Sequence, residues 1–309
     1  KEGIKIDGSF HQHHAQIYSG GYGMSLTDDV SKFMEMSVDT QFANEFTLEK
    51  KEIFQKLLLE GHLLLSFRNS IDFGTRGRNI SRPTSEYTTV PVDVLERAVV
   101  GDPANAGIYR AWINHINSGT AFPKANVNKH FWKSDMTIHR CPTWMASVRM
   151  ASDRVIGTES GTDNVKGYYL ADGALYTYVD GDEYTDVFPC WDWRKVPGVT
   201  CYQEDKAVHV MGWLEKQNKG SFVGNVNDGV IGLTSMDLVR DGLYARKTWI
   251  FTPDYILCLG AGIRSDSSYQ VNTSVEQAVL RDDLLHLHKG KWEVVKDLNF
   301  SCENPQRFF

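Results

Sequence analysis

Three histidines and two tyrosines crowd into a short glycine-rich stretch near the start of the chain. The stretch reads DGSFHQHHAQIYSGGYG over residues 7–23, with His11, His13 and His14 close together and Tyr22 between two glycines. Imidazole and phenol groups can take up and release protons during catalysis. The neighbouring glycines permit backbone angles that strain other residues, so the chain could turn and bring Tyr22 back towards the histidines.

The same stretch has two other interpretations. It could be a surface loop whose histidines are simply hydrogen-bonded, or the HxH pair of His11 and His13 could bind a metal ion. The HEXXH motif is absent and no carboxylate stands at an obvious spacing for a third ligand, so we expect no metal site. In an extended chain, side chains alternate, which predicts His11 and His13 on one side and His14 on the other.

A group of arginines follows in a second glycine-punctuated segment. The segment FGTRGRNISRP, residues 73–83, contains Arg76, Arg78 and Arg82. Guanidinium groups bind carboxylate or sulfate groups with two parallel hydrogen bonds and stay charged, although scattered surface arginines would give the same pattern. Asn79, which we place beside the substrate, also starts a glycosylation sequon. A glycan there would block the cleft, which favours a bacterial source.

An acidic residue stands in a third polar loop. Glu159 lies in RVIGTESGTDNVKG, residues 154–167, where it could orient a base or an arginine, or be an ordinary turn residue. Together the three segments contain a base, a phenol, an anion clamp and an orienting carboxylate. These groups suit the removal of a proton next to a carboxylate.

The composition narrows the class of protein. The 309 residues are 41% apolar and 12% aromatic, which is typical of a globular chain long enough for two domains. The net charge of -6 argues against a nucleic-acid partner, and no apolar run approaches the length of a membrane span. The five cysteines are odd in number and lack CxxC spacing, which argues against a zinc site or a dense disulfide framework. Flat aromatic rings suit either sugar stacking or ordinary packing.

The first part of the chain predicts helices that position these segments. Thr27 could cap one helix, and Thr47 a longer helix in which apolar residues recur at helical spacing. Pro91 and Pro103 each suit the first turn of a further helix.

After Phe122 the sequence consists of short runs of β-branched and aromatic residues separated by predicted turns. Two such runs flank Asp172-Gly173, which predicts a hairpin at that dipeptide. We therefore expect an α+β chain with a helical domain over residues 1–125 and an antiparallel β-sandwich domain over 126–309.

The order of motifs resembles polysaccharide lyase family 8, the bacterial hyaluronan, chondroitin AC and xanthan lyases. The resemblance rests on DGSF-x-QH leading into Y-[ST]-G-x-YG, then RGR-x-ISR, HR-x-x-x-W, ES-x-x-x-N-x-KG, DW-x-x-x-PG-x-T, ARK-x-W-x-F and LGAGI. These blocks occur in order over nearly the whole chain.

The resemblance implies a role for particular residues. The family's catalytic histidine precedes its catalytic tyrosine by nine places, which matches His13 and Tyr22. Its paired arginines match Arg78 and Arg82, and its supporting glutamate matches Glu159. The family also uses an asparagine from an earlier helix of an (α/α) toroid. We therefore expect residues 1–125 to be the last part of that toroid and the sandwich to be incomplete.

The activity implied is β-elimination in a uronic-acid-containing polysaccharide such as chondroitin sulfate or hyaluronan, with xanthan also open. It would need no cofactor, and a bacterial lyase of this kind would be secreted or periplasmic. Tyr22 would take the proton from C5, helped by neighbouring guanidinium charge. Arg76 and the tryptophans Trp144, Trp191 and Trp193 would contact the sugar chain, unless the tryptophans belong to the core.

Two other functions fit parts of the pattern. A glycoside hydrolase on an (α/α) toroid needs two facing carboxylates, and only Glu159 stands out. A non-catalytic carbohydrate-binding module would explain the aromatic residues and the arginines but not the spacing of His13 and Tyr22.

Overall fold

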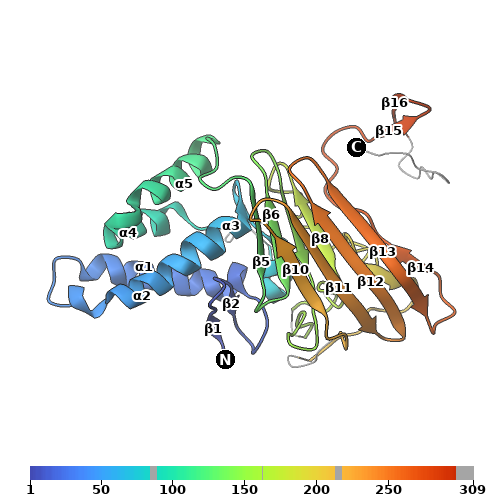
Figure 1. The fold of residues 1–309 in the computed structure, drawn as a ribbon, viewed down its shortest axis with the longest axis horizontal. Helices are drawn as coiled ribbons and strands as arrows, with labels where there is room; N and C mark the ends of the chain where they lie inside the picture. The colour runs from blue at the N-terminus through green and yellow to red at the C-terminus, as the bar shows by residue number, and fades with distance from the viewer. Residues whose placement is uncertain (84–88, 162, 213–217, 297–309) are drawn as a thin grey trace.

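A computed structural model describes residues 1–83, 89–161, 163–212 and 218–296 of the chain. A helical part lies beside a β part made of two stacked sheets (Figure 1). The predicted class, a helical part followed by an antiparallel β-sandwich, is confirmed. The last described helix of the first part ends at Ser118, and the first sandwich strand begins at Val127.

The helical part combines regular helices with two π-helical segments. None of its described helices has the length and apolar character needed to cross a bilayer. The elements are η1 (Ser19–Gly23), α1 (Met24–Ser37), α2 (Leu48–Gln55), η3 (Lys56–His62), α3 (Leu63–Leu65), α4 (Val92–Gly101) and α5 (Ala106–Ser118), with short 3₁₀ turns η2 (Ala43–Glu45), η4 (Phe73–Thr75), η5 (Gly77–Ser81) and η6 (Pro103–Asn105).

The predicted start of one helix is confirmed and that of another is wrong. Thr47 caps α2, where its hydroxyl accepts a hydrogen bond from the backbone N–H of Lys50. Thr27 does not start a helix, because η1 runs directly into α1 at Met24. The Thr27 hydroxyl instead donates to the carbonyl of Gly23 at 2.9 Å, and so joins α1 to the end of η1.

Two four-stranded antiparallel sheets form the sandwich. The first has the order β5 (Val127–Phe131), β6 (Met136–Arg140), β7 (Met145–Arg149) and β8 (Ala174–Tyr178). The second has the order β10 (Val223–Asn227), β11 (Gly232–Arg240), β12 (Leu243–Phe251) and β13 (Ile256–Ser265). Shorter pairs are β1 (Gly3–Ile4) with β2 (Phe10–His11), β3 (Ser66–Phe67) with β4 (Ser70–Ile71), β9 (Thr200–Tyr202) with β14 (Val271–Thr273), and β15 (Leu285–His288) with β16 (Lys291–Val294).

The first sheet is buried on both faces, because it lies between the helices and the second sheet (Figure 1). Side chains alternate along a strand. In β7, Ala146 and Val148 pack into the core between the sheets, whereas Met145 packs into the core shared with the helices. Ser147 and Arg149 face the same way as Met145. They reach Asp72, which directly precedes the arginine segment, and Gly74, which lies within it.

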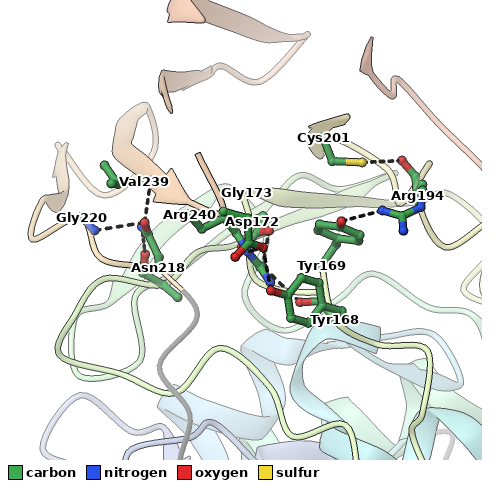
Figure 2. Close-up of polar contacts among 12 residues, drawn as sticks. Tyr168, Tyr169, Asp172, Gly173, Arg194, Cys201, Asn218, Gly220, Val239 and Arg240 are labelled. Carbon is green, nitrogen blue, oxygen red and sulfur yellow. Dashed lines mark hydrogen bonds and ion pairs between the residues drawn. The ribbon is translucent and has the colours of Figure 1, made fainter. Parts of the chain in front are cut away.

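The predicted hairpin at Asp172-Gly173 is wrong. Residues 168–173 form turns that lead into β8, and β8 pairs with β7. The Asp172 carboxylate is buried and forms an ion pair with Arg240 of β11, which also lies 3.8 Å from the ring centroid of Tyr168. Figure 2 shows this contact between the turn before β8 and the second sheet. The dipeptide therefore supplies a buried anion that joins the two sheets.

Removing one partner of a buried ion pair leaves the other charge uncompensated, which costs about 3–5 kcal/mol. We expect Asp172→Ala to lower the free energy of unfolding of the full-length protein by about this amount, as measured by denaturant-induced unfolding. Asp29→Ala, at an exposed position of α1, is the control and should change it by less than about 0.5 kcal/mol. Equal effects of the two substitutions would contradict a structural role for the Asp172–Arg240 pair.

Candidate active site

Glu159 is the residue on which the predicted site converges. Its side chain is buried, and its Oε1 accepts hydrogen bonds from the Tyr18 hydroxyl and from Nη1 of Arg78, both at 3.0 Å. Its Oε2 lies 2.6 Å from Nδ1 of His13, which donates because a carboxylate can only accept. Two donors from the stretch 7–23 and one from the arginine segment therefore share one carboxylate.

The loop that carries Glu159 is held at both its ends. Arg149, the last residue of β7, donates to the carbonyls of Gly74 and Gly157, so it ties this loop to the arginine segment. The Asn164 amide donates to the Glu159 carbonyl at 3.1 Å. A Cβ at Gly167 would lie 2.2 Å from the Asn164 amide nitrogen, so glycine is needed there. These contacts give a physical reason for the ES-x-x-x-N-x-KG pattern.

Tyr22 lies on η1 and is 37% exposed. Its hydroxyl oxygen accepts a hydrogen bond of 2.9 Å from Nη2 of Arg78, and its ring centroid lies 5.3 Å from that of His13. π-Helical segments such as η1 often occur at functional sites. The end of η1 is fixed by the hydroxyl of Thr27, which also lies 2.9 Å from Nε2 of the buried His62.

His13 differs from its two neighbours in what it contacts. The extended geometry assumed for the three histidines is wrong, because His13 and His14 both have a left-handed backbone, with φ of 55° and 67°. His11 points away from Glu159 and its Nε2 lies 2.8 Å from the Ser134 hydroxyl. The backbone N–H of His14 donates to Glu2, and the His14 side chain is exposed. Of the three, only His13 contacts Glu159.

Tyr18 is a member of the site that the sequence analysis did not identify. It is fully buried, and its hydroxyl donates to Glu159 and accepts the backbone N–H of Arg78 at 2.9 Å. Burial and the nearby Glu159 charge raise the pKa of Tyr18 well above its usual value, so this phenol stays a donor. The sequence feature that could have identified Tyr18 is the set of glycines that surround its ring. A Cβ at Gly77 would lie 2.1 Å from Cζ of Tyr18, and one at Gly21 would lie 2.6 Å from Cδ1.

The two arginines expected to act as a pair have different surroundings. Arg78 is partly buried, which lowers its pKa, but Tyr18, Glu159 and Tyr22 together raise that pKa above its ordinary value. Arg78 therefore stays charged at the centre of the site. Arg82 is half exposed and pairs with Asp163, to which its Nε donates at 2.9 Å. A pocket of about 130 Å³ joins them; its lining residues are Gly21, Tyr22, Ser25, Arg78, Asn79 and Arg82.

The remaining predicted contact residues lie outside this pocket. Arg76 is buried, and its Cγ lies 2.9 Å from where a Cβ on Gly20 would stand, so it packs beneath η1. Trp191 and Trp193 are 7% and 5% exposed and belong to the core, although their edges line a surface hollow. The Trp144 indole donates to the carbonyl of Pro253. Trp144 directly precedes β7, whereas the loop that carries Glu159 follows the other end of that strand.

No group of three or more histidine, cysteine, aspartate or glutamate side chains is placed to hold a metal ion in the part of the chain that the structure describes. The site offers instead an exposed phenol next to a guanidinium and an imidazole, with a shared buried carboxylate behind them. Such a set can move a proton and stabilise negative charge.

Comparisons with known proteins agree with the motif order. Residues 1–114 match the model for "Polysaccharide lyase family 8, N terminal alpha-helical domain", and residues 126–304 match "Polysaccharide lyase family 8, super-sandwich domain". The chain is 32% identical to a chondroitinase-AC of Pedobacter heparinus over 92% of its length, and 26% identical to a hyaluronate lyase of Thermasporomyces composti over 92%. It spans 41% of the length of each of these relatives.

Solved structures show the same relationship. A chondroitinase AC lyase structure aligns with 92% of the chain at a TM-score of 0.85 and 32% identity, and the chain covers 42% of it. A Paenibacillus xanthan lyase aligns with 94% of the chain at a TM-score of 0.82 and 23% identity, which shows a shared fold, and the chain covers 31% of it. With both family models matched in order along its length, this chain belongs to polysaccharide lyase family 8.

Proposed function

We propose that the protein containing this chain cleaves uronic-acid-containing polysaccharides by β-elimination, with chondroitin sulfate, hyaluronan or both as substrates. The observation that carries the proposal is the continuous set of contacts from the Tyr22 hydroxyl through Arg78 to Glu159 and on to His13. The similarity to a chondroitinase-AC supports this substrate class. The chain spans less than half of that relative, so the activity is assigned to the whole protein.

Tyr22 is the proposed base. Its hydroxyl is accessible from the pocket, and the Arg78 guanidinium that donates to it would stabilise a phenolate at that oxygen. The phenolate would take the proton from C5 of the uronate. The electron pair of the C5–H bond would then form the C4–C5 double bond as the C4–O4 bond breaks.

The same residue can complete the reaction. Tyr22, now a neutral phenol, would give its proton to the departing O4 oxygen and so return to its starting state. No water enters the products, and no other proton donor is needed. The products would be a new non-reducing end carrying an unsaturated uronate and a free hydroxyl on the other fragment.

His13 and Glu159 would act together on the uronate. Because Nδ1 of His13 donates to Glu159, the ring has a fixed orientation. His13 would help to stabilise the charge that develops on the substrate carboxylate. It is also the alternative base for uronates of the opposite configuration at C5. Arg82, on the outer side of the pocket, would bind an anionic group of the sugar chain.

Hydrolysis is less well supported by this geometry. A hydrolase requires two carboxyl groups that flank the scissile bond. Glu159 is buried and accepts hydrogen bonds from three side chains, and the nearby Asp163 pairs with Arg82. Since these polymers are too large to enter a cell intact, we propose a secreted or periplasmic location in a bacterium.

Tyr22→Phe removes the proposed base and keeps the ring. We expect kcat of the full-length protein to fall by about 10²–10⁴-fold, because that is the usual contribution of a positioned acid–base group. The measurement is the ultraviolet absorbance of the unsaturated product, together with product masses from chondroitin sulfate and hyaluronan. Tyr255→Phe, on the exposed surface, is the matched control. Near-normal turnover by Tyr22→Phe would remove Tyr22 from this role, and saturated products would replace elimination by hydrolysis.

Gly77 provides a test that removes none of the proposed reacting groups. Its φ is +55°, and a Cβ there would collide with the ring of Tyr18, so Gly77→Ala should displace the backbone of Arg78. Overpacking of this kind costs about 1–3 kcal/mol, and we expect activity to fall together with the melting temperature. Gly107→Ala, where nothing lies within 4 Å of the new Cβ on α5, should leave both unchanged or slightly raise stability. Full activity in Gly77→Ala would contradict the proposed dependence on Tyr18.

A further inference from the structure

A pocket larger than the one beside Tyr22 lies elsewhere on the described chain. It has a volume of about 780 Å³ and lies where the N-terminal segment meets β5 and β10. Pockets of this size can hold a small ligand or a short stretch of a polymer. The residues that matter most for its chemistry are Lys5, Trp132, Lys133, Arg154 and Asn225, with Lys1 at its edge.

The charge of this pocket is positive. Its lining contains lysine and arginine side chains but no aspartate or glutamate. Within the described residues, neither Lys5 nor Lys133 forms a salt bridge. Partial burial lowers the pKa of Lys5, the nearby Asp7 carboxylate raises it, and the charge of Lys133 lowers it. Two like charges that share a pocket repel each other, and a bound anion would relieve that repulsion.

The acidic residues nearest to the pocket are already occupied by protein groups. The Asp135 carboxylate pairs with Arg154 at 2.8 Å and accepts the backbone N–H of Ser152 at 2.8 Å. The Asp7 carboxylate accepts the backbone N–H of Ser9 and, at 2.7 Å, that of Lys133. These contacts lie behind the pocket and fix the backbone that carries its cations.

An exposed aromatic ring stands beside the cations. The Trp132 side chain is 52% exposed, and Nζ of Lys133 lies 4.5 Å from its ring centroid. Indole faces stack on the apolar faces of sugars, while the Asn225 amide at the wall can donate to and accept from hydroxyl groups. An acidic sugar has a group to match each of these: its carboxylate or sulfate would pair with an ammonium, its ring face with the indole, and its hydroxyls with the amide.

The pocket lies on the other side of the loop that presents His13. His11 and Ala15 line the pocket, whereas His13, midway between them, contacts Glu159. Residue 11 bridges to Ile17, and the carbonyl of Ala15 accepts the N–H of Ile156, so this loop is fixed from both sides. Burial lowers the pKa of His11 to about 4, so its imidazole is neutral and adds no charge.

We propose that this pocket is an accessory site that binds a carboxylate- or sulfate-bearing sugar of the same polymer chain, away from the bond that is cut. The choice of an acidic polysaccharide as ligand rests on the proposed function. Lys5 and Lys133 bind the anionic group, Arg154 adds positive charge, and Trp132 stacks on the sugar ring. Binding here would hold a long polymer on the enzyme without touching the reacting atoms.

The test compares long and short substrates in the full-length protein. In the double variant Lys5→Ala/Lys133→Ala we expect KM for long chondroitin sulfate to rise roughly ten-fold, since each exposed charge contributes a few-fold, while kcat is unchanged. KM for a tetrasaccharide should not change. The paired control is Lys289→Ala/Lys291→Ala on the exposed β15–β16 hairpin, which should alter neither value. Equal rises for both substrates would place the lysines in the cleavage site, and no rise would overturn the accessory site.

A binding measurement separates this proposal from the proposed activity. Calorimetry in a Tyr22→Phe background follows oligosaccharide binding without turnover, so it can be interpreted even if the protein proves not to be a lyase. If the double lysine variant loses affinity only for sulfated chondroitin, the bound anion is a sulfate. If it loses affinity for unsulfated chondroitin as well, the bound anion is a carboxylate. Trp132→Ala should weaken binding of both polymers. Unchanged affinity in all of these variants would overturn the site.

Discussion

A buried carboxylate is expensive unless hydrogen-bond donors surround it, and the active site depends on how Glu159 meets this constraint. Tyr18, Arg78 and His13 each supply one donor, the first and last from the stretch 7–23 and Arg78 from the arginine segment. The need to satisfy one negative charge therefore brings the histidine loop, the π-helical turn and the arginine segment together. Their shared partner lies on the sandwich side of the molecule, so the reactive groups stay in register only while the helical and β parts remain packed.

The surrounding backbone takes up the strain that this convergence requires. His13 and His14 both adopt left-handed conformations, which are unfavourable for residues with a side chain. The Glu2 carboxylate accepts the N–H of His14, and Glu159 fixes His13, so hydrogen bonds on both sides offset the cost. Gly77 and Gly21 lack side chains and so leave room for the ring of Tyr18. At this site, left-handed backbone and glycines without side chains thus occur next to the groups that contact Glu159.

Much of the site could be predicted from the sequence because its members carry spacing signals. The nine-residue interval from His13 to Tyr22 and the RGR-x-ISR pattern identified side chains that the structure brings together: Arg78 contacts Tyr22, and both Arg78 and His13 contact Glu159. Tyr18 was missed because a buried tyrosine looks like core, and its importance shows only when neighbouring glycines are seen to fit around its ring. Arg76 shares the arginine-rich segment but faces inward, a distinction that depends on the 3₁₀ turns on either side of it.

The fold shows the same division between local and long-range information. Helices with regular apolar spacing were predicted, but the π-helical forms of η1 and η3 were not, since they arise from packing between the two segments. Asp172-Gly173 carries a strong local hairpin signal. It was overruled by a partner, Arg240, that lies 68 residues away in the chain and demands a buried anion at that position. Local propensity is a weak preference when a buried charge must be neutralised, because an unpaired ion costs several kcal/mol and a turn preference about one or less.

The loop around His13 contributes to two separate surfaces. One side of it holds an imidazole against Glu159, and the other side contributes His11 and Ala15 to the wall of a cationic pocket. The contacts that keep the loop in place, from Ile156 and from Ser134, come from the β part. A change that loosened this loop would disturb the cleavage site and the pocket together, whereas a change to Lys133, whose backbone is fixed by Asp7, would affect the pocket alone. The charge of the pocket can therefore vary without changing the geometry around Glu159, so the proposed polymer binding and the proposed cleavage can change independently.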